Sequence, residues 1–215
     1  MPNNAHAPEM PAKDHWDTVY STRPDDAVSW FQAHAEQSLR LIAAAGLQHS
    51  AAIIDVGGGA STLVDDLLHQ GFEHLSVLDL SAAALSVARA RLGARAAEVQ
   101  WIEGDITRVE LPVHAYDLWH DRAVFHFLTD PLQRQAYVDA VMRAVKPGGH
   151  VIVATFAKDG PLECSGLTVA RYDAEELHAQ FGAALTLVRH ENETHLTPAG
   201  VAQKFVYCHF RKGAS

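Results

Sequence analysis

The stretch Ile53-Ile54-Asp55-Val56-Gly57-Gly58-Gly59-Ala60-Ser61-Thr62 decides the fold of this chain. Residues 51–56 are almost all apolar and rich in β-branched side chains, as is typical of a central parallel strand covered on both faces. The three glycines let the chain turn sharply and let a ligand approach the backbone closely. Residues 60–69 then carry apolar side chains at the spacing of one helix face. Because a helix start offers free N–H groups and a positive dipole end, this order predicts a nucleotide-type site at the carboxyl edge of a sheet.

Length and composition bound the possible functions. The chain has 215 residues, which suit one α/β domain with a full core, and its formal net charge is −9. This charge argues against a nonspecific nucleic-acid-binding surface, which needs an excess of basic residues. No apolar run reaches the roughly 18 residues that a membrane span needs, and residues 1–13 lack the pattern of a secretory signal. From the charge and the short apolar runs, we expect no nucleic-acid or membrane partner. Because the chain has only two cysteines, Cys164 and Cys208, we expect a cytoplasmic protein.

The N-terminal part divides into two segments. We expect residues 1–14 to form a flexible tail and residues 15–215 to form one domain. Within that domain, residues 15–46 bring two tryptophans, a tyrosine and a phenylalanine together and then form an amphipathic helix. Two interpretations of the aromatic residues stay open. They staple the N-terminus to the core, or they form a lid over a pocket in which Trp30 and Phe31 wall the acceptor site.

The rest of the chain alternates between strand and helix patterns. Strands are predicted at residues 51–56, 75–80, 99–102, 116–119 and 150–156, followed by a terminal pair at 185–193 and 201–211. Ser81 and Asp173 are predicted helix caps, and Pro131 a helix start. This alternation predicts an α/β fold, a Rossmann-like doubly wound sheet of seven strands, mostly parallel, with an antiparallel C-terminal hairpin.

Further motifs follow the glycine turn in a fixed order. Asp79 ends the second strand about twenty residues downstream, where a carboxylate meets ribose hydroxyls. Gly104-Asp105-Ile106 and then residues 146–149 (Lys-Pro-Gly-Gly) mark two more turns. Together these motifs resemble the class I S-adenosylmethionine-dependent methyltransferases, from about Trp16 to the C-terminus. Residues 121–123 (Asp-Arg-Ala) resemble the thiopurine-methyltransferase-like group, and the paired Trp-Asp and Ser-Trp-Phe-Gln segments resemble the N-termini of small lysine methyltransferases.

The resemblance implies a set of contacts to S-adenosyl-L-methionine. Asp55 is expected to orient the amino group of the methionine part, and Asp79 to accept hydrogen bonds from both ribose hydroxyls. Asp105 is expected to bind the adenine amino group. The complete expected set is Asp55, Gly57, Gly58, Gly59, Asp79, Leu80, Asp105, Ile106 and His120.

The transfer itself asks little of the protein, because a sulfonium methyl is already activated and mainly needs an aligned nucleophile. If the nucleophile must lose a proton, His120 and His126 are the candidate bases. His126 has an alternative as a structural residue on the helix after the fourth strand. Arg122 binds an anionic substrate or forms an ion pair, and Cys164 touches the substrate or is a small buried residue. No metal site is expected, because the histidine spacing is not that of ligands on one helix face.

Two acceptor classes remain open. One is a small-molecule nucleophile (a thiol, a chalcogen species or a heterocycle), and the other is a lysine on a protein. An NAD-dependent oxidoreductase is less favoured, because Thr62 stands where the dinucleotide fingerprint has Gly or Ala and Asp55 precedes the first glycine. A non-catalytic nucleotide-binding module is the last alternative.

Overall fold

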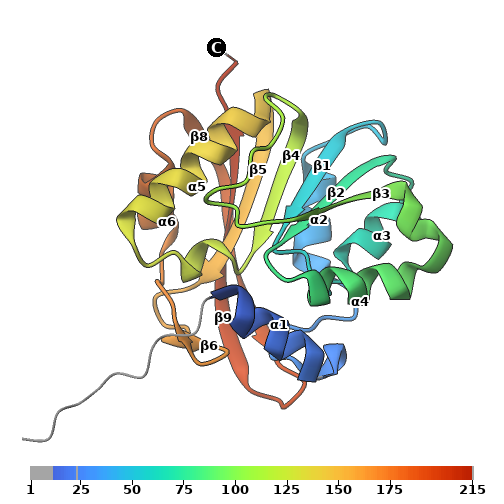
Figure 1. Cartoon of the computed structure of the whole chain (residues 1–215). Helices are drawn as coiled ribbons and strands as arrows, with labels where there is room; N and C mark the ends of the chain where they lie inside the picture. Colours follow the sequence, from blue (N-terminus) through green and yellow to red (C-terminus); the bar gives the residue numbers. More distant parts are fainter. Residues whose placement is uncertain (1–11, 23, 215) are drawn as a thin grey trace, which may run out of the picture.

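A computed structural model describes residues 12–22 and 24–214. Its central sheet has seven strands in the order β3-β2-β1-β4-β5-β9-β8 (Figure 1). The strands are β1 (Ala52–Val56), β2 (His74–Asp79), β3 (Val99–Glu103), β4 (Tyr116–Arg122), β5 (Val145–Phe156), β8 (Leu185–Leu196) and β9 (Ala202–Lys212). Strands β1 to β5 pair in parallel, and β9 pairs antiparallel with both β5 and β8. The predicted seven-stranded α/β fold with an antiparallel C-terminal hairpin is confirmed.

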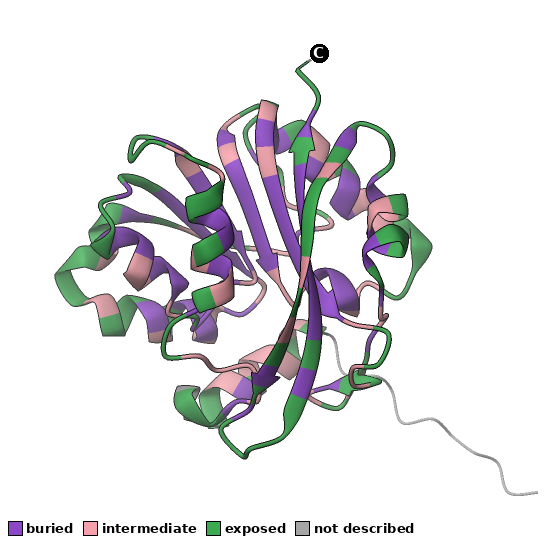
Figure 2. Ribbon diagram, turned by 180° about the vertical axis from the view of Figure 1, so that it is seen from behind, coloured by how far each residue is buried: buried purple, intermediate pink, exposed green. Residues whose placement is uncertain are grey.

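Helices cover both faces of the sheet. The core cluster on one face includes buried residues of α2 (Glu36–Ala44), α3 (Leu63–His69) and α4 (Ala82–Leu92), and the cluster on the other face those of α5 (Pro131–Ala144) and α6 (Ala174–Phe181). Neighbouring residues of β1 show why both faces are apolar, since Ile53 packs in the first cluster and Ile54 in the second. Figure 2 shows the resulting buried strands between the two helical layers.

The predicted helix starts are confirmed in detail. The Ser81 hydroxyl accepts a hydrogen bond from the Ala84 N–H at 3.1 Å, so it caps α4. Asp173 forms a capping box with Glu176 at the start of α6. Pro131 occupies the first turn of α5, where its missing N–H costs no hydrogen bond.

Two boundaries around β4 and β5 differ from the prediction. Strand β4 continues to Arg122 instead of ending at Trp119, because β1 pairs with it on one side and β5 on the other. Residues 146–149 lie within β5 and not before it: Tyr116 pairs with Val145 and Leu118 with His150, so these four residues make an irregularity in the ladder.

The N-terminal segment lies across the carboxyl ends of the parallel strands (Figure 1). Helix α1 (Ala12–Thr22) begins at Ala12, so residues 12–14, assigned to the tail by the sequence, are helical. The rest of that predicted tail, residues 1–11, lies outside the described residues. A short 3-10 turn, η1 (Asp25–Ala27), connects α1 to the segment before α2. Within the described ranges, no helix has the length and apolar character that crossing a membrane requires.

Candidate functional site

Two neighbouring cavities lie where the strand order reverses between β1 and β4, the position at which open α/β sheets bind ligands. The larger has a volume of about 210 Å³ and the smaller of about 50 Å³. The glycine turn, the ends of β2, β4 and β5, helix α1 and the start of β9 line the larger one. The smaller one adjoins it, and Tyr20, Trp30, Gly57 and Arg122 line both.

The glycine turn brings the backbone close to two carboxylates. A Cβ atom at Gly58 would lie 2.5 Å from Asp55 Oδ2, and one at Gly59 would lie 2.6 Å from Asp79 Oδ2. Such distances are too short for a methyl group, and Gly59 also has a positive φ of +30°. The turn therefore keeps both acids beside the backbone that lines the cavities.

A buried hydrogen-bond chain joins β1, β4 and α2 at the smaller cavity. His120 Nδ1 lies 2.7 Å from Asp55 Oδ1, and His120 Nε2 lies 2.8 Å from Ser38 Oγ. All three residues are at least 96% buried, and Asp55 and His120 line the cavity. Because both ring nitrogens of His120 have partners, this histidine holds Asp55 in place and has no free nitrogen with which to take a proton from an acceptor.

Asp79 stands at the carboxyl end of β2 and lines the larger cavity. Its Oδ1 accepts a hydrogen bond from the Ser81 N–H at 2.8 Å. Burial, and to a smaller extent the charges of Asp55 and Asp17, raise the pKa of this carboxyl to about 7. A ligand that donates hydrogen bonds to Asp79 would therefore stabilise its ionised form.

The expected adenine contacts gather at the same cavity. Leu80, Asp105 and Ile106 all line it. Asp105 Oδ1 accepts hydrogen bonds from the N–H and the hydroxyl of Thr107, at 2.9 and 2.7 Å. The carboxyl group is 40% exposed, so it keeps room for a further donor.

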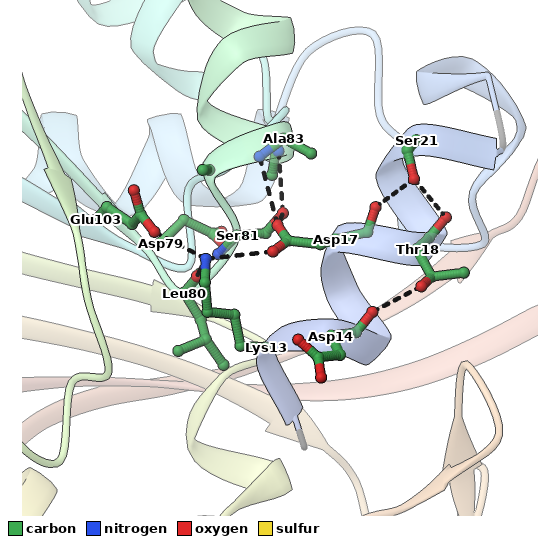
Figure 3. Close-up of polar contacts among 12 residues, drawn as sticks. Lys13, Asp14, Asp17, Thr18, Ser21, Asp79, Leu80, Ser81, Ala83 and Glu103 are labelled. Atoms are coloured by element: carbon green, nitrogen blue, oxygen red, sulfur yellow. Dashed lines mark hydrogen bonds and ion pairs between the residues drawn. The ribbon is translucent and has the colours of Figure 1, made fainter. Parts of the chain in front are cut away.

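Helix α1 is fastened over this end of the cavity by two side chains (Figure 3). Lys13 Nζ donates to Glu103 Oε1 at 2.7 Å and to the Leu80 carbonyl at 3.3 Å. Asp17 Oδ1 accepts from the Ser81 hydroxyl at 2.6 Å, at the N-terminus of α4. These hydrogen bonds hold α1 against the ends of β2 and β3, the strands that carry Asp79 and Glu103.

Aromatic side chains form another wall of the larger cavity. The ring of Trp16 lies 5.6 Å from that of Trp30 and 5.2 Å from that of Phe127, both edge to face. Trp30 Nε1 donates to the hydroxyl of Tyr20 at 3.2 Å. These four residues line the larger cavity, whereas Phe31 lines only the smaller one. The N-terminal aromatic residues therefore wall the cavity, and they also pack against the body of the protein.

Arg122 and Cys164 face the larger cavity from β4 and from the short strand β6 (Glu163–Cys164). Strand β6 pairs antiparallel with β7 (Leu167–Thr168). Arg122 Nε donates to the Tyr207 hydroxyl at 3.0 Å, and Nη1 donates to the Trp30 carbonyl at 3.1 Å. Burial raises the pKa of the Cys164 thiol to about 12, so this sulfur stays protonated and is no nucleophile at neutral pH.

His126 lies outside both cavities. It sits in the 3-10 turn η3 (Phe125–Phe127), and not on a helix as expected, with a fully buried ring between Phe127 and Phe156. Burial lowers the pKa of His126 to about 3, so the ring is neutral. We therefore do not retain it as a candidate base.

Asp121 has a structural role. It accepts hydrogen bonds from the N–H groups of Val124 and Phe125, and the Tyr137 hydroxyl donates to it at 2.6 Å.

In the part of the chain that the structure describes, no group of three or more His, Cys, Asp or Glu side chains is placed to hold a metal ion.

Sequence reasoning missed several residues of the site. Ser38 gave no signal because a serine within an amphipathic helix is unremarkable until its partner His120 is known. Gln203 and Phe205 belong to β9, which enters the cavity only through the sheet order. Lys13 was assigned to the tail, although Trp16 and Tyr20 next to it mark an aromatic segment.

Residues 53–149 match the family model described as a methyltransferase domain. EEF1A lysine methyltransferase 2 of Danio rerio is 24% identical over 163 residues, which cover 68% of this chain and 69% of that protein. The ubiquinone biosynthesis O-methyltransferase of Alkalilimnicola ehrlichii is 35% identical over 107 residues, which cover 50% of this chain but 42% of that protein. The chain thus matches less than half the length of the second relative.

Solved structures share the fold over nearly the whole chain. One, described as the conversion of a disulfide bond into a thioacetal group during echinomycin biosynthesis, has a TM-score of 0.75 at 19% identity and covers 94% of this chain and 92% of its own. The N-methyltransferase NodS of Bradyrhizobium japonicum WM9, in complex with S-adenosyl-L-homocysteine, has a TM-score of 0.64 at 20% identity and covers 82% of this chain and 84% of its own.

Proposed function

We propose that this chain, which has the fold of the S-adenosyl-L-methionine-dependent methyltransferases, transfers the methyl group of that cofactor to a small-molecule nucleophile by in-line displacement. The observation that carries this proposal is the position of Asp79. It is a buried carboxylate at the end of β2, beside the glycine turn, with an aromatic-walled cavity in front of it. Because the sulfonium methyl is already activated, alignment of the acceptor is the main requirement.

The proposed cofactor pose follows the two cavities. Asp79 accepts hydrogen bonds from the ribose hydroxyls, while Leu80, Asp105 and Ile106 hold the adenine. The methionine part runs along Gly57, Gly58 and Gly59 toward the smaller cavity. There Asp55, positioned by His120 and Ser38, orients the amino group.

The acceptor then lies against the aromatic wall, with its nucleophilic atom toward the methyl group. Trp30, Arg122 and Cys164 are its proposed contacts in the larger cavity, and Phe31 borders the smaller one. With both nitrogens of His120 in buried hydrogen bonds, we assign this histidine to positioning and not to general base catalysis. Arg122, which lines both cavities, is the charged residue that we propose to contact the acceptor, and its guanidinium donates hydrogen bonds but takes no proton.

Protein lysine methylation is the alternative, and the similarity to EEF1A lysine methyltransferase 2 is what favours it. The cavity favours a small molecule instead, because the positive charge of Arg122 repels an ammonium group. The likeness of residues 121–123 to thiopurine-methyltransferase-like proteins points the same way, although Asp121 itself serves the local fold. A cytoplasmic location remains a prediction from composition.

Calorimetry with S-adenosyl-L-homocysteine tests the proposal first, with NAD as the comparison ligand. We expect S-adenosyl-L-homocysteine to bind and NAD not to bind, and the reverse preference would contradict the methyltransferase assignment. A screen with labelled cofactor then separates the acceptor classes. Labelled small thiols or heterocycles support the main proposal, labelled protein lysines support the alternative, and binding without any transfer favours a non-catalytic nucleotide-binding module.

A further inference from the structure

We propose that the acceptor is bound as an anion, held in the aromatic part of the larger cavity by Arg122 Nη2 and the side-chain amide of Gln203. This inference rests on the proposed function and narrows its substrate class to small molecules that carry a negative charge at or beside the nucleophilic atom. Thiolates, selenolates and acidic heterocycles or phenols meet this condition, whereas amines do not.

Three contacts hold the guanidinium of Arg122 in place, and one of its nitrogens has no hydrogen-bond partner in the described part of the chain. The guanidinium donates to the Tyr207 hydroxyl and to the Trp30 carbonyl, and its carbon lies 4.7 Å from the centre of the Phe205 ring. Nη2 is buried and has no hydrogen-bond partner among residues 12–22 and 24–214. Because an unpaired buried donor is costly, this atom is positioned for a ligand that accepts a hydrogen bond.

The charge of Arg122 is only partly compensated. Glu193 Oε2 lies 3.9 Å from Nη2, close enough for an ion pair but beyond hydrogen-bond distance, so the protons of Nη2 remain available to another acceptor. Glu193 is instead engaged by the Tyr207 hydroxyl at 2.9 Å and by Gln32 Nε2 at 3.0 Å. The arginine side chain is 11% exposed, so its positive charge acts in a site largely shielded from water and attracts an anion strongly.

Gln203 supplies the second polar group of the same compartment. It lines the larger cavity and is 7% exposed, and its Oε1 has no hydrogen-bond partner in the described part of the chain. Gln203, Phe205 and Tyr207 alternate along β9, so their side chains project from the same face of the sheet, the face that Arg122 contacts. The amide nitrogen Nε2 can donate a hydrogen bond to the anion, whereas the unpartnered Oε1 accepts one and therefore suits a substrate with an N–H or O–H group next to its charge.

The other titratable groups near this compartment do not provide a base. Cys164 stays protonated, and burial followed by the charge of Asp79 raises the pKa of the Tyr20 hydroxyl above its usual range. His120 has both ring nitrogens engaged, and Asp79 and Asp105 belong to the cofactor end. An acceptor that arrives already ionised needs no base, which agrees with this arrangement.

The chemical step is balanced without a proton transfer. A lone pair of the anionic atom forms a bond to the methyl carbon, while the bond between that carbon and the sulfonium sulfur breaks. The electron pair of the broken bond stays on the sulfur, which becomes the neutral thioether of S-adenosyl-L-homocysteine. The acceptor loses its negative charge, so the methylated product loses its attraction to Arg122 and is released more readily than the substrate.

Three ligands of similar size test the proposal: benzoate, benzyl alcohol and benzylammonium. Each is titrated by calorimetry into the full chain saturated with S-adenosyl-L-homocysteine. Benzoate is expected to bind at least tenfold more tightly than benzyl alcohol, and benzylammonium to bind most weakly. Equal or tighter binding of benzylammonium, or no binding of benzoate, would overturn the proposal.

Variants separate the two polar groups. Arg122→Gln is expected to abolish the preference for benzoate, Arg122→Lys to keep part of it, and Gln203→Leu to weaken benzoate binding severalfold. Arg189→Gln serves as the control, because Arg189 is 47% exposed and lines neither cavity. A benzoate preference that survives in Arg122→Gln refutes the role of the arginine.

The saturation step keeps the two levels of inference apart. If S-adenosyl-L-homocysteine does not bind, the proposed function fails. If it binds and benzoate shows no preference, only the anionic acceptor is refuted. With a set of substituted thiophenols as acceptors, kcat/KM should rise with pH through the pKa of each thiol, and one common inflection for all of them would contradict transfer to a pre-ionised acceptor.

Discussion

The ribose role of Asp79 can be tested through the pH dependence of cofactor binding. Burial raises the pKa of this carboxyl to about 7 in the free protein, and only the ionised form accepts hydrogen bonds from two hydroxyls. The ionised fraction is roughly one tenth at pH 6 and nine tenths at pH 8 for a pKa of about 7. Because affinity scales with the competent fraction, S-adenosyl-L-homocysteine should bind about tenfold more weakly at pH 6 than at pH 8.

The substitution Asp79→Asn should remove this pH dependence. At pH 8 it should also weaken binding by about 1.5–3 kcal/mol, the range for hydrogen bonds to a charged group, which is roughly 10- to 150-fold. Isothermal titration calorimetry at pH 6, 7 and 8 measures both effects. Asp139→Asn, an exposed position on α5, is the matched control. Any titration of the ligand itself appears equally in both variants.

The same pKa shift has a second consequence, for stability without ligand. A carboxyl whose pKa is raised on folding contributes stability that is complete below its unfolded pKa of about 4 and is lost as pH rises through the folded pKa. The difference in melting temperature between wild type and Asp79→Asn should therefore turn against the wild type between pH 4 and pH 7. The ribose role of Asp79 would be refuted if the wild-type affinity for S-adenosyl-L-homocysteine were constant from pH 6 to pH 8 and Asp79→Asn bound this ligand as tightly as the wild type.

Three further predictions concern the supports of the site. Ser38→Ala leaves His120 Nε2 buried without its partner, so urea unfolding should show a loss of about 1–3 kcal/mol, and an unchanged midpoint would contradict the hydrogen-bond chain. Gly58→Ala places a methyl group 2.5 Å from Asp55 Oδ2, so binding of S-adenosyl-L-homocysteine should fall at least tenfold, whereas wild-type affinity would mean that the turn relaxes freely. Asp17→Ala removes the contact of α1 with the start of α4, and stopped-flow tryptophan fluorescence should show ligand dissociation accelerated severalfold; an unchanged rate would mean that α1 does not hold the ligand in place.

The fold could be predicted from local patterns because the residues within each strand and helix favour that secondary structure. Residues 51–62 predicted a buried strand, a glycine turn and a helix, and the structure contains β1, the turn and α3 in that order. Caps at Ser81 and Asp173 were also predictable, since a cap interacts with backbone only three residues away. Boundaries set by distant partners were not, as β4 shows by continuing to Arg122 between β1 and β5.

Of the residues that line the two cavities, the sequence indicated mainly those at the strand ends. Asp55, Asp79 and Asp105 each lie within about two residues of the end of a strand, and parallel strands bring such ends to one edge of the sheet. The acceptor half depends on contacts over long sequence separations. The histidines illustrate this, because only the folded chain shows that His120 is engaged at both nitrogens and that His126 is enclosed between phenylalanines.

The sequence by itself determined the sheet, the glycine turn and the order of the carboxylates, since these follow from the alternation of apolar residues, glycines and strand ends. Only the tertiary structure decided which side chains line the larger cavity beside the glycine turn. Strand β9 inserts antiparallel next to β5, so Gln203 and Phe205 near its start reach the carboxyl ends of the parallel strands and line the same cavity as Arg122. The physical reason is that strand insertion and the docking of α1 depend on pairing and packing between segments far apart in the sequence, such as Phe156 with Phe205 and Lys13 with Glu103, which no local pattern encodes.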